Sequence, residues 1–272
     1  MKSAAHRNSN LPSAEHSPAN RLAQVSQLRE QIARCETQRR PDHQDSSSSG
    51  TPILDRLLPA GGFRPGTLIE WLEPGPASGT SALVILAARH ACRLGRQLVV
   101  LDRSRRFYPL ALVPWKIPSE QVLVVRASTA ADELWAADQA LRSTAVGAVW
   151  LTCDELASPD FRRLQLAAEQ GGSLGLLLRP DQYLGQPSWA DVQWRVTPAG
   201  AARASPGASS RWLSIELTRC RGGHPKPPLT IEIDDHSGNV REVPGHANAT
   251  TPALPGTSQL AHPTTARRAA RA

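Results

Sequence analysis

Residues 67–94 read TLIEWLEPGPASGTSALVILAARHACRL, which is an apolar stretch, a glycine-rich turn and a second apolar stretch in direct succession. The first stretch, residues 67–72, is a nearly continuous apolar run and is typical of a strand buried on both faces of a sheet. Residues 81–94 are long and apolar enough for a buried helix. The succession of strand, turn and helix predicts one unit of an α/β fold.

The same alternation continues after this unit. Strands are predicted at residues 97–102, 121–126, 146–152 and 173–178, and helices at residues 130–143 and 159–170. Apolar strands joined by helices predict a mainly parallel sheet with helices on both faces. The later strands are predicted to form an antiparallel C-terminal extension, because short or glycine-rich loops join them. These strands are residues 191–197, 211–219 and 229–234.

Composition divides the chain into five parts. Residues 1–20 and 235–272 are too poor in apolar side chains to fold and are expected to be disordered tails, and residues 41–52, PDHQDSSSSGTP, are expected to form a linker. Residues 53–234 are the predicted core domain. Residues 21–40 are predicted to form a tethered amphipathic helix.

The tethered helix carries its apolar side chains at three- and four-residue steps, which places them on one face. These side chains are Leu22, Val25, Leu28 and Ile32. One interpretation is that this face folds back on the core domain. The other is that it binds another protein, as amphipathic helices do when they enter an apolar groove.

Charge is spread evenly along the 272 residues. The formal net charge is +7, and Lys and Arg outnumber Asp and Glu by 7 to 5 in residues 1–50, by 20 to 17 in residues 51–234 and by 4 to 2 in residues 235–272. A basic balance is compatible with nucleic-acid contact, but an even spread is also typical of an ordinary soluble surface. Charge alone therefore does not identify a partner.

The four cysteines and the apolar runs exclude several classes of protein. The cysteines are far apart, form no CxxC pair and have no histidine at a ligand-like spacing, so reduced thiols and no metal site are expected. No stretch reaches the ~18 apolar residues of a membrane span, and the polar N-terminus does not resemble a signal peptide. We expect a cytoplasmic protein without membrane segments.

The turn EPGPASGTS at residues 73–81 lies where a phosphate-binding loop lies, between a strand and a helix. A working loop reads GxxxxGK[ST], in which backbone N–H groups cradle phosphates, the lysine neutralises them and the hydroxyl binds Mg²⁺. Here three residues instead of four separate the glycines, and a threonine stands at the lysine position. We interpret this degenerate phosphate loop as a structural turn, with weak anion binding or hydrolysis as alternatives. Its residues are Gly75, Ser78, Gly79, Thr80 and Ser81.

Two arginine clusters are candidate contacts to DNA or to a partner protein. Arg103, Arg105 and Arg106 follow the strand at 97–102, at the edge where open α/β sheets place ligands. Arg219 and Arg221 lie in the glycine-rich turn RCRGG. The alternative for both clusters is an ordinary solvated turn.

Three aromatic residues near these segments, Trp71, Tyr108 and Trp115, have the side chains that stack on bases. Their apolar neighbours favour positions in the core.

Five segments together resemble the ImuA family in their order and spacing. They are GGFRPGTLIEWL at 61–72, PGPASG at 74–79, LQLAAE at 164–169, GLLLRP at 175–180 and RWLSIELTRCRGG at 211–223. That family is a RecA-like group encoded in bacterial SOS mutagenesis cassettes beside a Y-family polymerase-like protein and an error-prone polymerase. The resemblance covers about residues 21–234. It implies a RecA-like fold and an accessory role in SOS-induced translesion synthesis after DNA damage, with RecA and the two polymerase proteins as partners and DNA as a further candidate.

Departures from RecA-type ATPases are informative. Such an enzyme has a catalytic Glu two residues past the Asp that ends the second core strand, and Ser104, which stands there, cannot act as a base. The strand at 146–152 should end in an Mg²⁺-associated Asp but ends in Thr152, which leaves Asp154 as a candidate on the same face. With Thr80 in place of the lysine, these losses predict a non-catalytic protein with no catalytic residues and no cofactor. Two alternatives stay open: a nucleotide-hydrolysing recombinase-type ATPase, and a cell-division inhibitor like the SulA family, which shares the degenerate core but has shorter chains.

Overall fold

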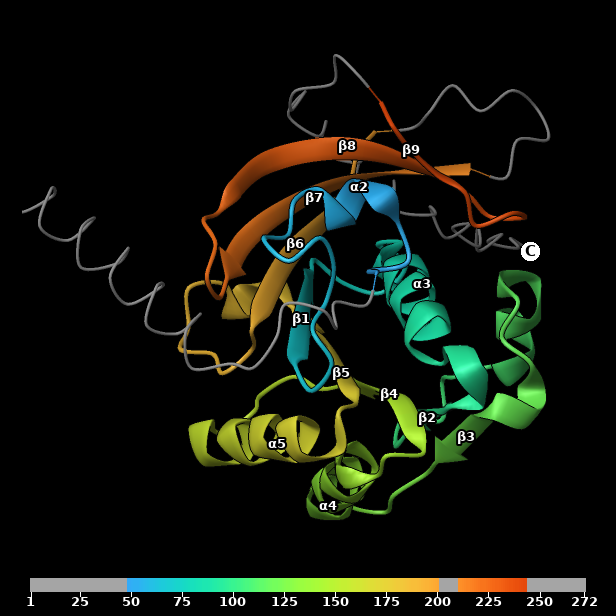
Figure 1. Cartoon of the computed structure of the whole chain (residues 1–272), viewed down its shortest axis with the longest axis vertical. Coiled ribbons are helices and arrows are strands. Elements are labelled where there is room, and N and C mark those ends of the chain that lie inside the picture. The colour runs from blue at the N-terminus through green and yellow to red at the C-terminus, as the bar shows by residue number, and fades with distance from the viewer. Residues whose placement is uncertain (1–47, 201–209, 244–272) are drawn as a thin grey trace, which may run out of the picture.

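β1, Leu68–Glu73, lies near the centre of a nine-stranded sheet in the computed structural model, which describes residues 48–200 and 210–243 (Figure 1). The other strands are β2 (Gln97–Leu101), β3 (Val122–Val125), β4 (Val146–Thr152), β5 (Leu174–Pro180), β6 (Val192–Pro198), β7 (Ser210–Cys220), β8 (Lys226–Asp234) and β9 (Val240–Glu242). The α-helices are α2 (Pro52–Asp55), α3 (Thr80–Ala91), α4 (Ala130–Arg142) and α5 (Ser158–Gly171). Short 3-10 helices are η2 (Arg93–Gly95), η3 (Pro109–Trp115), η4 (Ser119–Gln121) and η5 (Asp181–Tyr183).

The strand order is β3-β2-β4-β5-β1-β6-β7-β8-β9. The first six strands in this order are parallel to their neighbours, and β7, β8 and β9 are antiparallel. The predicted parallel sheet with an antiparallel C-terminal extension is therefore confirmed. The prediction for residues 191–197 was wrong in part, because β6 pairs in parallel with β1 and antiparallel only with β7. The connection from β5 crosses one face of the sheet, so β6 runs in the same direction as β5 and β1. The strand direction therefore first reverses at β7, one strand later than expected.

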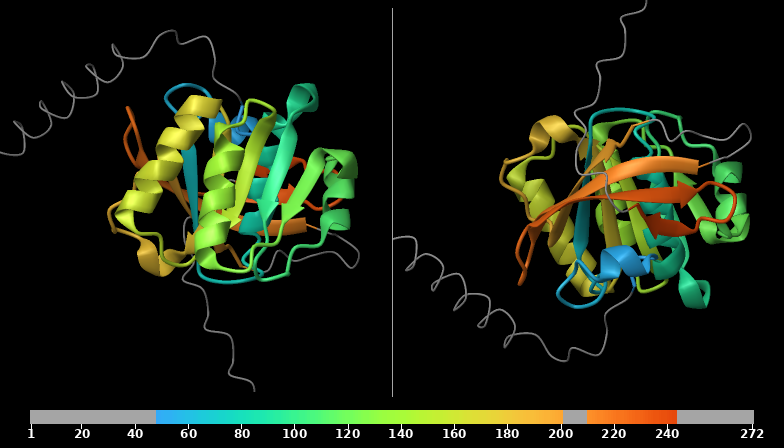
Figure 2. Two further views of the ribbon diagram at one scale, coloured as in Figure 1. Left: turned by 90° about the horizontal axis from the view of Figure 1, so that it is seen from below. Right: turned by 90° about the horizontal axis from the view of Figure 1, so that it is seen from above.

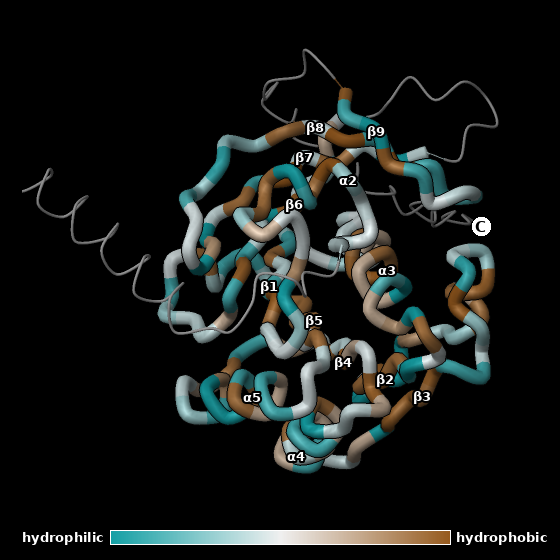
Figure 3. Tube along the Cα trace, in the orientation of Figure 1, coloured by the Kyte–Doolittle hydropathy of each residue, from teal (hydrophilic) through white to brown (hydrophobic). Residues whose placement is uncertain are grey.

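Helices cover both faces of the sheet. α4 and α5 lie side by side on one face, where the apolar side chains of β4 and β5 form a core with them (Figure 2). α3 lies on the opposite face, and β7, β8 and β9 arch over it (Figures 1 and 2). α3 is thus apolar along most of its length, whereas α4 and α5 mix polar and apolar residues, as expected for helices with one exposed side (Figure 3).

The folded domain extends beyond both predicted limits. Ser49 is buried, and the Thr51 hydroxyl accepts a hydrogen bond of 3.1 Å from the Leu54 N–H, which caps α2. Residues 48–52 therefore pack on the domain, although they were predicted to belong to the linker. The polar composition misled the prediction, because hydrogen bonds of serine and threonine, not apolar burial, hold this segment.

Residues 235–243 were predicted to belong to the disordered C-terminal tail, but they form a turn and β9. Hydrogen bonds of a polar side chain hold this segment too. The Asp234 side chain accepts hydrogen bonds from the N–H groups of His236 and Ser237, at 2.9 and 2.8 Å, and turns the chain into β9. The predicted tethered helix, with Leu22, Val25, Leu28 and Ile32, and the outer parts of both tails lie outside the described residues.

No helix in the described part of the chain is long and apolar enough to cross a membrane.

Candidate functional site

The degenerate phosphate loop joins β1 to α3 and is filled by its own side chains. Ser78 and Thr80 are buried, and their hydroxyl oxygens lie 2.8 Å apart. The Ser78 hydroxyl also donates a hydrogen bond to the carboxylate of Glu73, the last residue of β1. The hydroxyl groups that would face a phosphate are therefore bonded to one another and to a carboxylate of the same chain.

Glu73 reaches the loop because of strand parity. Ile69, Trp71 and Glu73 alternate with residues of the other face, and the first two pack in the core on the α3 side. Burial raises the pKa of Glu73 above the ordinary carboxyl value, while hydrogen bonds from Ser78 and Thr80 oppose part of this effect. When it is ionised, Glu73 places negative charge beside the N-terminus of α3.

The outer side of the loop is covered by β7. Gly79 precedes α3 with a φ of 92°, and a Cβ atom there would lie 2.8 Å from Leu213 Cδ2 and 3.3 Å from Arg211 Cδ. Arg211 is in turn held by Asp235 through a 2.6 Å ion pair. β7 thus packs directly against the glycine that precedes α3.

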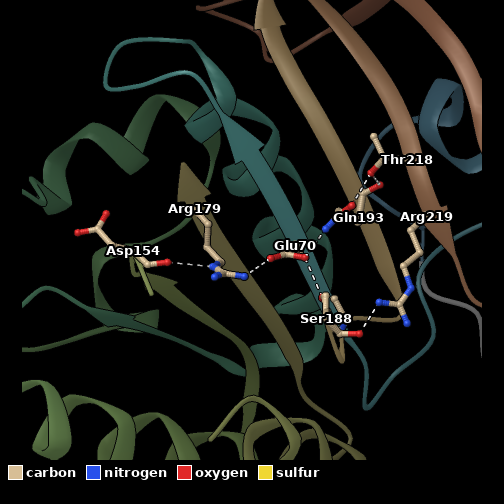
Figure 4. A network of polar contacts seen from close by, with 8 residues as sticks. Glu70, Asp154, Arg179, Ser188, Gln193, Thr218 and Arg219 are labelled. Atoms are coloured by element: carbon tan, nitrogen blue, oxygen red, sulfur yellow. Dashed lines mark hydrogen bonds and ion pairs between the residues drawn. The ribbon is translucent and has the colours of Figure 1, made fainter. Parts of the chain in front are cut away.

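Ser104 and Asp154, the two positions compared above with the acidic residues of RecA-type ATPases, both lie at the surface. Ser104 lies on an exposed loop, and the Asp102 carboxylate before it is buried, where it accepts a 2.8 Å hydrogen bond from the Arg106 N–H and lies 3.6 Å from Arg126. β4 ends at Thr152, so strand parity does not extend to Asp154. The carboxylate of Asp154 is exposed and points away from the polar network drawn in Figure 4.

Sheet topology places the two arginine clusters at opposite edges. Arg103, Arg105 and Arg106 follow the carboxyl end of β2. Arg219 is the penultimate residue of β7 and Arg221 follows the end of this strand. The last residue of β7 pairs with the first residue of β6, so both arginines lie at the amino edge of the parallel strands. The two clusters therefore cannot form one continuous surface.

Partners within each cluster differ. Arg103 forms a 3.0 Å ion pair with Glu133, and Arg221 forms one of 3.2 Å with Asp191. Arg105 and Arg106 are exposed, and the described residues provide no ion pair for either. Arg219 donates a hydrogen bond to the Ser188 carbonyl oxygen.

A buried polar network crosses the sheet on the α5 face (Figure 4). Glu70, which is fully buried in β1, accepts hydrogen bonds from Arg179, from the Ser188 hydroxyl at 2.9 Å and from the Gln193 amide at 2.7 Å. The Thr218 hydroxyl donates to the Gln193 side chain at 2.8 Å, which connects the network to β7. This network holds the connection between β5 and β6, which carries no α-helix.

The predicted core positions are confirmed for Trp71 and Trp115 and wrong for Tyr108, whose apolar neighbours in the sequence do not bury it. Trp71 is fully buried and stacks on Trp194 with ring centroids 6.0 Å apart, and Trp115 is buried. Tyr108 is 64% exposed. Two further residues of interest, Trp189, which is 40% exposed, and Glu73, were not predicted from the sequence. The parity of β1 could have identified Glu73, whereas no local pattern distinguishes Trp189.

Cys92, Cys153 and Cys220 are free, and burial raises the pKa of the Cys220 thiol to about 11. Across residues 48–200 and 210–243 no group of three His, Cys, Asp or Glu side chains is placed to bind a metal ion.

Comparison with known proteins gives both a relative and a fold. No family model matches the chain. Protein ImuA from two strains of Caulobacter vibrioides is 30% identical over 197 residues, which cover 65% of this chain and 80% of that protein. This chain matches the crystal structure of the RadB recombinase with a TM-score of 0.52 at 18% sequence identity. The match covers 72% of this chain and 99% of the RadB chain. The fold is therefore RecA-like.

Proposed function

The chain belongs to the ImuA family, and we propose that it is a non-catalytic accessory protein of SOS-induced translesion DNA synthesis. In this role it binds protein partners, namely RecA, a Y-family polymerase-like protein or an error-prone polymerase. It contributes the surfaces of a RecA-like domain and does not hydrolyse a nucleotide.

The observation that carries the non-catalytic part is the closed phosphate loop. A P-loop enzyme needs free N–H and hydroxyl groups and a lysine at the phosphates. This loop has a buried threonine at the lysine position and a carboxylate bonded to its hydroxyl groups. An anion entering the loop would have to displace Glu73 and approach under Leu213, and no positive side chain of the loop would compensate.

For partner binding we propose the stripe of Leu22, Val25, Leu28 and Ile32, on the basis of its sequence pattern. Full burial of an apolar side chain contributes about 1.5–3 kcal/mol before ordering costs, so four of them can support an interface.

One experiment tests both parts of the proposal in cells that lack the endogenous gene. DNA-damage-induced mutation frequency is measured with the wild-type chain, with Ser81→Ala and with Leu28→Asp combined with Ile32→Asp. Ser81 stands where a P-loop hydroxyl would bind Mg²⁺ and is only half-buried, so Ser81→Ala should leave mutagenesis unchanged.

The double aspartate variant should reduce mutagenesis to the level of the deletion, because charges on the stripe prevent its burial. Loss of function in Ser81→Ala would indicate nucleotide chemistry and contradict the non-catalytic role. Full function of the double variant, at equal protein levels, would show that the stripe binds no required partner.

A further inference from the structure

The connection between β5 and β6 presents an indole ring in a fixed orientation. Trp189 donates its Nε1–H to the Ser158 hydroxyl at 3.0 Å, and the Arg162 guanidinium lies 4.7 Å from the centre of its ring. Trp189 as a whole remains 40% exposed despite both contacts. An exposed aromatic side chain that is held in place at two points loses little conformational entropy when a planar ligand stacks on it.

Arginines continue from this ring to the turn after β7. Arg219 donates a hydrogen bond to the carbonyl oxygen of Ser188, the residue before Trp189. Arg221 pairs with Asp191, two residues after Trp189, and lines a small surface pocket together with Arg64. We call Arg162, Trp189, Arg219, Arg221 and Arg64 the Arg–Trp strip.

Positive charge dominates the Arg–Trp strip. Among its four arginines, an ion pair within the described residues is found for Arg221 alone. Arg162 instead donates to the Gln165 side chain, and Arg219 to a carbonyl oxygen. Guanidinium groups without a carboxylate partner keep their full attraction for anions, and their planar donors match the oxygens of a phosphate.

The strip is built on rigid parts of the fold. Ser188 is fixed by its hydrogen bond to buried Glu70, and Thr218, next to Arg219, is fixed through Gln193 by the same network (Figure 4). On the other side, a Cβ atom on Gly223 would lie 2.6 Å from Pro59 Cγ, so the turn after β7 packs closely on the segment before Arg64. Segments that are far apart in sequence are thereby held as one surface.

We propose that the Arg–Trp strip binds single-stranded DNA, with backbone phosphates at Arg219, Arg221 and Arg64 and a base stacked on Trp189. Cationic side chains beside an exposed aromatic ring are the combination by which proteins bind single strands without reading sequence. An acidic peptide would satisfy the arginines but would leave the indole face unused. The inference goes beyond the protein partners proposed above and does not depend on them.

The test measures the affinity of the full chain for a fluorescein-labelled oligothymidylate by fluorescence anisotropy over a series of NaCl concentrations. Trp189→Ala should weaken binding by about tenfold, the scale of one lost stacking contact, and leave the salt dependence unchanged. Trp189→Phe should restore most of the affinity. Arg219→Ala combined with Arg221→Ala should reduce the slope of log K against log[NaCl] by about 1.4, because two phosphate contacts on a single strand are lost.

Arg93→Ala combined with Lys116→Ala is the matched control, since it removes the same charge from two exposed positions outside the strip and outside the cluster of Arg103, Arg105 and Arg106. This control should retain the wild-type slope. Thermal melting shows whether loss of the Arg221–Asp191 pair impairs folding. If it does, Arg64→Ala provides a second strip variant, which breaks no ion pair of the described residues.

Three results would overturn the proposal. These are the absence of binding to the oligothymidylate, an equal loss of slope in the strip and control variants, and displacement of the DNA by polyglutamate at the concentrations at which unlabelled DNA displaces it. The last result would identify an acidic polypeptide as the better ligand.

Discussion

Glu73 changes what the loop between β1 and α3 can do. A phosphate-binding loop attracts an anion with N–H groups, a helix N-terminus and a lysine. In this chain the lysine position holds Thr80, and Glu73 brings a carboxylate to the Ser78 hydroxyl. This carboxylate adds a negative group beside the N-terminus of α3 and takes up the Ser78 hydroxyl.

The raised pKa of Glu73 predicts how the stability of the protein depends on pH. Since the folded state binds this proton more tightly than the unfolded state, the contribution of Glu73 to stability is fully present below the ordinary carboxyl pKa of about 4.3 and is lost as pH rises through the raised value. Glu73→Gln mimics the protonated form. It should raise the melting temperature at pH 7 by a few degrees and have little effect at pH 4.

Glu155→Gln, which alters an exposed carboxylate, is the control for this measurement and should change neither value. A lower melting temperature for Glu73→Gln at pH 7 would mean that the ionised carboxylate stabilises the loop, contrary to this account.

At the scale of elements, the antiparallel arch of β7, β8 and β9 determines what the loop can contact. The apolar residues Leu213, Ile215 and Ile231 belong to the same core cluster as the buried side chains of α3, and Leu213 lies directly against Gly79. α3 is therefore enclosed between the parallel strands and the arch, and the N-terminus of α3 is covered as a consequence.

The last strand of the arch is predicted to be part of the stable domain. Val240 packs on the α3-side core and pairs with Ile233 of β8. A chain that ends after Val243 should unfold like the full-length protein, whereas a chain that ends after Asp234 should lose about 1–3 kcal/mol, the scale of one or two buried apolar side chains. Urea denaturation followed by circular dichroism measures both. Equal stability of the two truncated chains would show that β9 is dispensable.

The sequence predicted the elements that depend on apolar runs and missed those that depend on hydrogen bonds. The buried strands β1, β4 and β5 were predicted close to their observed limits, because each contains a continuous apolar segment. The Ser48–Thr51 segment and the turn at Asp234 are polar and were assigned to the linker and the tail. Their order comes from side-chain oxygens that accept backbone N–H groups, a pattern that composition does not distinguish from disorder.

At the scale of the whole molecule, the sheet separates the two arginine clusters that the sequence analysis treated together as candidate contacts to DNA or a partner. The five arginines proposed for DNA contact divide between two opposite edges, and only the strand order shows this. The candidate site was predicted in part: replacement of the lysine by Thr80 was visible in the sequence. Closure of the loop by Glu73 and Leu213, and the position of Trp189 beside Arg219, required the three-dimensional arrangement.

The central claim is that this RecA-like domain no longer uses its phosphate loop, and isothermal titration calorimetry with Mg²⁺-ATP tests it most directly. The account predicts no binding heat for the wild-type chain up to about 1 mM ATP, a range in which even an interaction of about 4 kcal/mol would be detected. Saturable binding that requires Mg²⁺ and is lost in Ser81→Ala would contradict the account, because it would show that the loop opens to bind a nucleotide as a working P-loop does.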